Sequence, residues 1–121
     1  MSSNEVLSFG IGGFSYGNQS ISVQGSDADG YVAYCRKAYS ADDVEEREVA
    51  LEVEQVTAFF QAAEDLGVFE WEARYMKSPM DGSDWDLSVD YGEHAGFASR
   101  GYSAQPQRFT DFMTLLKDLG F

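Results

Sequence analysis

The spacing of apolar residues changes in the middle of this chain. Val49, Leu51 and Val53 alternate with acidic or small residues, which predicts a half-exposed strand with one apolar face and one acidic face. From residue 54 onward the apolar side chains recur at helical spacing, and Gly67 follows where the left-handed cap of a helix belongs. The helical stripe consists of Val56, Phe59, Phe60, Ala63 and Leu66. The sequence therefore predicts a strand that leads directly into an amphipathic helix.

Strand patterns precede this helix. Residues 6–11, 20–23 and 31–36 are rich in β-branched and aromatic side chains and are separated by turns that contain glycine. This arrangement is typical of a β-meander.

Strand patterns also follow the helix. Apolar and polar residues alternate over 69–75 and 84–91, and a further strand is expected over 97–102, with turns at Asp81-Gly82 and at 92–96. A last helix is predicted to have Pro106 in its first turn and to end at Gly120. Its buried stripe would consist of Phe109, Phe112, Met113 and Leu116.

The order of strands, helix, strands and helix predicts an α+β fold. Strands joined by short turns indicate a mostly antiparallel sheet, here of about six to seven strands, with both helices packed on one face in two layers. The 121 residues contain no internal repeat and no linker, so a single domain over residues 1–121 is expected. The order of the strands within the sheet does not follow from the sequence.

The second half of the chain carries a recurring set of turn and packing residues. Trp71 and Tyr75 precede a DG-x-x-W segment at 81–85, and a G-x-x-x-x-P-x-x-F segment at 101–109 leads into the final helix. This pattern resembles that of small uncharacterised bacterial α+β proteins. The resemblance covers residues 69–121, and this chain has Tyr102 where those proteins have an asparagine. It implies a fold more than an activity.

The charge balance excludes several kinds of partner. The chain has 21 acidic and 8 basic residues and a formal net charge of −13, which disfavours binding to nucleic acid and to anionic membranes. It has no apolar window of membrane-spanning length and begins without the pattern of a secretion signal. With a single cysteine, Cys35, it cannot form an internal disulfide. We therefore expect a cytoplasmic protein of bacterial type, monomeric or homodimeric.

The sequence offers little catalytic equipment. His94, the one histidine, lies in a glycine-rich turn that we expect to be exposed, and Cys35 is expected to face the core. The glycines of 10–17 lack a phosphate-binding motif, and Asp27-x-Asp29-Gly30 lacks the other ligands of a calcium loop. We therefore predict neither a cofactor nor a metal, and binding is favoured over catalysis.

A basic protein is the partner that the acidic surface favours, because complementary charge raises association rates. The best hypothesis is a non-enzymatic acidic protein-binding domain, in its most concrete form an inhibitor or immunity-like protein that masks a basic toxin. The candidate binding residues lie on the acidic strand faces and among the nearby aromatic residues: Asp84, Asp86, Asp90, Glu48, Glu52, Trp85 and Tyr91.

The alternative is a domain that binds or hydrolyses a small molecule. Its pocket would lie between the sheet and the helices and would be lined by Phe59, Phe60, Trp71 and Phe112.

Overall fold

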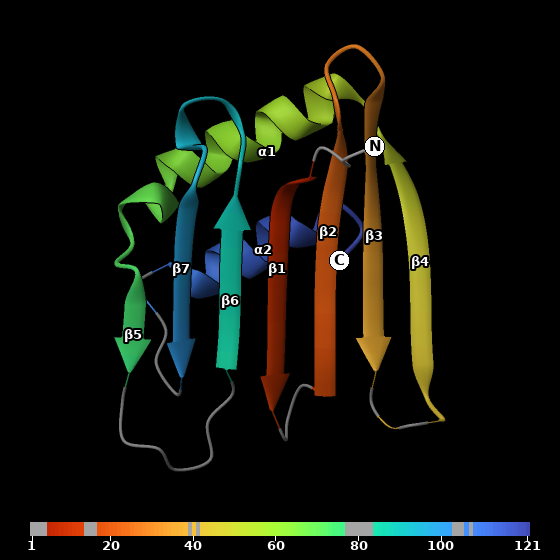
Figure 1. Ribbon diagram of the computed structural model, residues 1–121, viewed down its shortest axis with the longest axis vertical. Helices are drawn as coiled ribbons and strands as arrows, with labels where there is room; N and C mark the ends of the chain where they lie inside the picture. Colours follow the sequence, from red (N-terminus) through yellow and green to blue (C-terminus); the bar gives the residue numbers. More distant parts are fainter. Residues whose placement is uncertain are drawn as a thin grey trace.

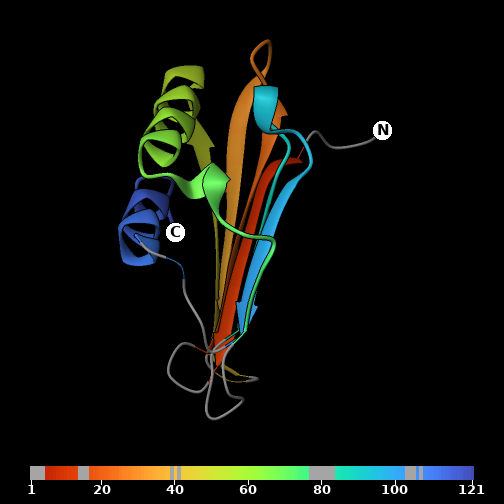
Figure 2. The ribbon, with the colours of Figure 1, turned by 90° about the vertical axis from the view of Figure 1, so that its left-hand side faces the viewer.

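The computed structural model of the protein describes residues 5–13, 17–38, 40, 42–76, 84–102, 106 and 108–121. Within this part of the chain, seven strands form one sheet in the order β4-β3-β2-β1-β6-β7-β5. Figure 1 shows the strands in front of both helices, and Figure 2 shows both helices on the same side of the sheet. The predicted two-layer α+β fold, with a mostly antiparallel sheet and two helices on one face, is confirmed.

The first half of the sheet is an antiparallel meander, as predicted. Its strands are β1 (Glu5–Gly13), β2 (Gly17–Ser26), β3 (Gly30–Ala38) and β4 (Val44–Leu51). The hairpin between β2 and β3 depends on a glycine, because Gly25 has a φ of 141°. A Cβ atom at this position would lie 2.1 Å from the carbonyl oxygen of Gly30.

Helix α1 (Val53–Asp65) connects the two edges of the sheet, and Figure 1 shows it crossing behind the strands from the β4 side to the β5 side. At its start, the backbone N–H of Glu52 donates to the side-chain oxygen of Gln55 at 2.8 Å. At its end, Gly67 has the predicted left-handed conformation, with a φ of 82°. Strand β4 ends at Leu51, so Val53 belongs to the helix and not to the strand.

The strand predicted over 69–75 is mostly wrong. Residues Val68–Glu70 form a 3-10 turn, and only β5 (Arg74–Met76) is a strand, which pairs with β7 in parallel. The indole of Trp71 packs between the layers, 5.5 Å from the ring of Phe112. The chain descends here from the helix layer to the sheet edge, so it cannot stay extended within the sheet.

The remaining strands and the second helix complete the sheet. Strand β6 (Asp84–Val89) pairs with β1, β7 (Phe97–Tyr102) lies between β6 and β5, and α2 (Phe109–Lys117) follows. Helix α2 begins three residues after Pro106, which lies before the first turn and accepts a hydrogen bond from Phe109 N–H at 3.3 Å. The turn predicted at Asp81-Gly82 lies outside the described residues.

The core between the layers is dominated by aromatic rings. Phe9, from the central strand, lies 5.8 Å from both Phe112 and Phe121 and 6.1 Å from Phe109, measured between ring centroids. Phe112 is 1% exposed and also contacts the ring of Phe59. These contacts hold α2 against the middle of the sheet.

We predict that Phe112→Ala lowers the free energy of unfolding by about 3–5 kcal/mol, because it removes a ring that contacts both the sheet and α1. Thr110→Ala, at an exposed position of the same helix, should change it by less than about 0.5 kcal/mol. Urea denaturation of both variants measures the difference. Equal, small losses would contradict the placement of Phe112 at the centre of the core.

Candidate functional site

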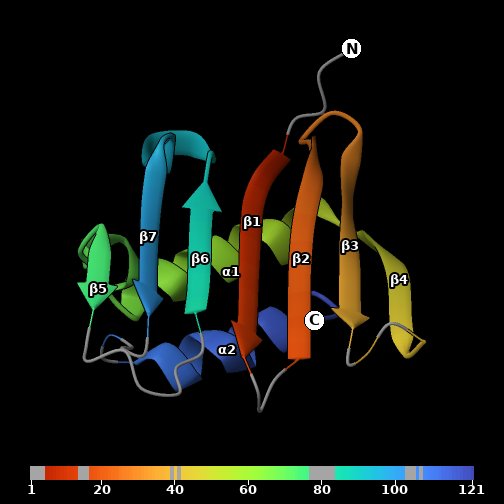
Figure 3. The ribbon, with the colours of Figure 1, turned by 60° about the horizontal axis from the view of Figure 1, so that its bottom comes forward.

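The face of the sheet opposite the helices is covered by no element of the described chain, as Figures 1 and 3 show from two directions. Side chains of alternate residues project from it, and strand pairing arranges them in rows across the sheet. The row through the middle of this face runs from edge to edge and consists of Glu46, Arg36, Ser20, Gly10, Asp86, Arg100 and Arg74. We call this side of the sheet the open face.

The centre of the open face is recessed because its residues have small side chains. Strand β1 contributes Ser8, Gly10 and Gly12. Ser8 pairs with serines on both neighbouring strands, and Gly10 pairs with a serine on β2. A shallow concavity of about 250 Å³ lies over Gly10 and Gly12, and two others, of about 440 and 800 Å³, lie over β2–β4 and over β5–β7. A partner could therefore bring its own side chains close to the sheet backbone.

Asp86 lies beside this recessed centre. Its residue is exposed as a whole, but Oδ1 lies only 3.2 Å from the point where a Cβ atom of Gly10 would be. Partial burial against β1 raises the pKa of the Asp86 carboxyl above its ordinary value, and the negative charge of Asp84 raises it further. The positive charge of Arg100 opposes this rise in pKa.

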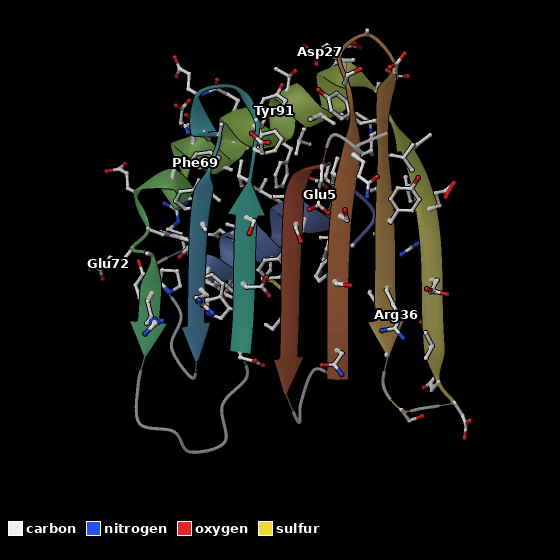
Figure 4. The ribbon with its side chains drawn as sticks, viewed as in Figure 1. Glu5, Asp27, Arg36, Phe69, Glu72 and Tyr91 are labelled. Carbon is white, nitrogen blue, oxygen red and sulfur yellow. The ribbon has the colours of Figure 1, made fainter. Side chains whose placement is uncertain are left out.

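Arginines interrupt the acidic surface. Arg36 lies on the open face, as Figure 4 shows, and its Nε is 3.7 Å from Glu46 Oε2. Arg74 and Arg100 are neighbours on β5 and β7, and neither forms an ion pair within the described residues. The open face is thus of mixed charge, whereas all charged residues among the predicted binding residues are acidic.

The structure brings together only some of the predicted binding residues. Asp84, Asp86 and Asp90 are exposed along β6 and at its end. Glu48 is also exposed, but it belongs to β4, about 19 Å away by four strand spacings of about 4.8 Å. Glu52 precedes α1 beyond the end of β4 and is not part of the β6 cluster.

Two of the predicted binding residues do not lie on the open face. Trp85 is 2% exposed and packs in the core, 5.0 Å from the ring of Phe109. Tyr91 is half-buried, stacks on Phe60 at 4.1 Å and has its hydroxyl 3.3 Å from that of Thr57, so it is held against α1 (Figure 4). Strand alternation is the physical reason: along β6, the side chains of odd-numbered residues face the helices, and Trp85 and Tyr91 continue this alternation.

The rings predicted to line a pocket between the layers pack against one another. Phe59 contacts Phe60 and Phe112 at 5.2 and 6.0 Å, and Phe112 contacts Trp71 at 5.5 Å. These four rings are therefore part of the packed core between the sheet and the helices.

The two candidate nucleophile or base residues serve packing. His94 is not the exposed turn residue that was expected: its ring stacks on Phe69 at 3.6 Å, and its Nε2 lies 3.7 Å from Glu64 Oε1. Cys35 faces the core as predicted, and burial raises the pKa of its thiol, although Arg47 and Lys37 oppose this rise. Within the described residues, no cluster of three or more potential metal ligands occurs.

Sequence reasoning missed Gly10, Arg74 and Arg100. The side of the sheet on which Gly10 and Arg74 lie was available from the sequence, because each is flanked by apolar residues of its strand. The proximity of Gly10 and Arg74 to Asp86 and Arg100 was not available, because it depends on the pairing of β6 with β1 and of β7 with β5.

Comparison with protein-family models and with curated proteins finds no match to this chain. Among the helices of the described chain, none has the length and apolar character needed to cross a membrane.

We predict that the carboxyl of Asp86 titrates above the ordinary range of aspartate, as measured by the side-chain carbon signal in NMR. Arg100→Ala should raise this pKa further, and Asp84→Asn should lower it, because each removes one of the charges that act on the carboxylate. A pKa at or below the ordinary value would contradict the partial burial against β1.

The same shift affects stability. Because the pKa of Asp86 is higher in the folded than in the unfolded state, its favourable contribution is present below the ordinary aspartate pKa and is lost as pH rises through the folded value. The stability of Asp86→Asn relative to the wild type should therefore increase over this pH interval. Denaturation curves across the interval test the direction, and a relative stability that decreases would contradict it.

Proposed function

We propose that this chain is a non-enzymatic protein-binding domain that docks its open face on the basic surface of another protein. The observation that carries this proposal is the Asp86 carboxylate, which is partly buried over Gly10 and has no ion-pair partner in the described chain. A partly desolvated charge without a counter-ion is unfavourable. A cationic side chain of another protein that pairs with Asp86 would therefore contribute favourably to the free energy of binding.

The charges around Asp86 support the same conclusion. The open face and its rim carry more carboxylates than guanidinium groups in the described chain: Glu5, Glu46, Glu48, Asp84, Asp86 and Asp90 against Arg36, Arg74 and Arg100. A net charge of −13 would attract a basic partner over a distance and raise the association rate.

An inhibitor or immunity-like protein is the most concrete form of this function. Such a protein would mask a basic toxin by covering its positive surface. A bacterial origin and a cytoplasmic location belong to the proposal, since a cell must hold such an inhibitor where the toxin would act. A homodimer formed through the open face is the competing use of the same surface.

The test is affinity capture from the native cell extract with three forms of the tagged protein. The open-face variant is Asp84→Lys/Asp86→Lys/Asp90→Lys. The matched control, Asp65→Lys/Glu70→Lys/Asp118→Lys, changes exposed acids of the helix side. Both variants change the net charge from −13 to −7, so a difference between them reports position and not total charge.

We expect the wild type and the control to retain one basic protein that the open-face variant loses. The association rate with that purified protein should fall at least about tenfold in the open-face variant at low salt, and the difference should shrink as salt is added. Equal capture by both variants would rule out the open face. Light scattering that shows a dimer of the wild type and a monomer of the open-face variant would favour self-association instead.

A further inference from the structure

Two arginines lie side by side at the β5 edge of the open face. The parallel pairing of β5 with β7 places Arg74 directly opposite Arg100, and the backbone N–H of Arg100 donates to Ala73 O at 3.0 Å. Both side chains are exposed, and both line the concavity of about 800 Å³ over β5–β7. The backbone thus holds the two residues in a fixed register within a hollow of the surface.

These two arginines differ from the other arginines of the described chain. Arg36 pairs with Glu46, Arg47 donates to the carbonyl oxygen of Gly120 at 2.9 Å, and Arg108 pairs with Asp111 at 2.7 Å. Arg74 and Arg100 form no ion pair within the same residues, although the chain has 21 acidic side chains. Like charges directly opposite each other on neighbouring strands are unfavourable, and no carboxylate of the described residues lies within ion-pair distance of either arginine.

Asp84 and Asp86 line the same concavity, but neither forms an ion pair with Arg74 or Arg100. Asp86 is the cross-strand neighbour of Arg100, yet its Oδ1 lies over Gly10 on β1. It remains outside ion-pair distance of Arg100. The absence of a side chain at Gly10 makes room for this orientation of Asp86, and Arg100 is an exposed residue of the concavity.

We propose that Arg74 and Arg100 bind a carboxylate group of the protein that docks on the open face. A guanidinium presents parallel N–H donors that match the two oxygens of a carboxylate, and two adjacent guanidinium groups offset its charge. A carboxylate has a single negative charge, so the field of a chain with a net charge of −13 repels it less than it repels a doubly charged phosphate.

This site would fix how the partner is oriented. Cations of the partner would face Asp84 and Asp86, and one of its acidic side chains would face Arg74 and Arg100. A basic surface that lacks the acidic group would leave the arginine pair without a counter-charge, which disfavours the wrong partner or the wrong register. The claim that the carboxylate comes from a docked protein rests on the proposed function. The ability of Arg74 and Arg100 to bind a carboxylate does not depend on it and can be tested with this chain alone.

The test uses the isolated chain and a single-carboxylate probe, N-acetylglutamate N-methylamide, at constant ionic strength. NMR follows the side-chain Nε–Hε signals of the arginines and, in variants that replace Arg74 and Arg100, the backbone amide signals of β5 and β7. We expect saturable shifts of the Arg74 and Arg100 signals with a dissociation constant on the order of millimolar, and much smaller shifts of Arg36. Arg74→Lys/Arg100→Lys keeps the net charge and should weaken binding about tenfold, because the planar fork of donors is lost.

The matched control is Arg47→Lys/Arg108→Lys, which replaces two arginines that lie off the open face and already have acceptors, and it should leave binding unchanged. No saturable shift in the wild type, or an equal loss in the control, would overturn the proposal. Inorganic phosphate that shifts the same signals at a lower concentration would overturn the assignment to a carboxylate. Failure of this titration while capture still depends on Asp84, Asp86 and Asp90 would remove the arginine site and leave the proposed function standing.

Discussion

Phe9, on the strand where the two halves of the sheet meet, contacts Phe109, Phe112 and Phe121, and these rings hold the C-terminal helix against the sheet. Burial of such large apolar side chains is the main favourable term for a domain of this size. Both helices are used on this one side (Figure 2). The other side of the seven strands must therefore be compatible with water, and the polar and small residues found there meet this requirement.

The composition of the open face goes beyond solubility. A sheet face that only had to remain soluble could carry long charged side chains throughout, but its central strand contributes Ser8, Gly10 and Gly12. The missing side chain at Gly10 allows Asp86 to lie against β1, which leaves one partly buried carboxylate unpaired and Arg100 open on the other side. The absence of a side chain at Gly10 therefore affects the shape of the surface, the position of Asp86 and the surroundings of Arg100.

The sequence was sufficient for the elements whose apolar period is clear, such as α1 and β6. The sequence-based prediction failed for β5. The apolar residues from Phe69 to Tyr75 reflect packing of Trp71 between the layers, and only Arg74–Met76 pair as a strand. The β6 carboxylates could be predicted from strand alternation alone. The pairing of Arg74 with Arg100 could not, since it requires the strand order, which is set by non-local contacts. The alternation of Trp85 with Asp84 and Asp86 already implied that its side chain faces the helices. Its assignment to a binding surface relied on the residue type and disregarded this alternation.

Carboxyl footprinting of the protein, free and bound to the partner retained in the capture experiment, tests the central claim most directly. A carbodiimide reagent labels exposed carboxylates, and mass spectrometry reports the label on each peptide. If the open face is the binding surface, Asp84, Asp86 and Asp90 become protected in the complex, while Asp65 and Asp118 on the helix side stay as reactive as in the free protein. Protection of the helix-side carboxylates with full labelling of β6 would contradict the account.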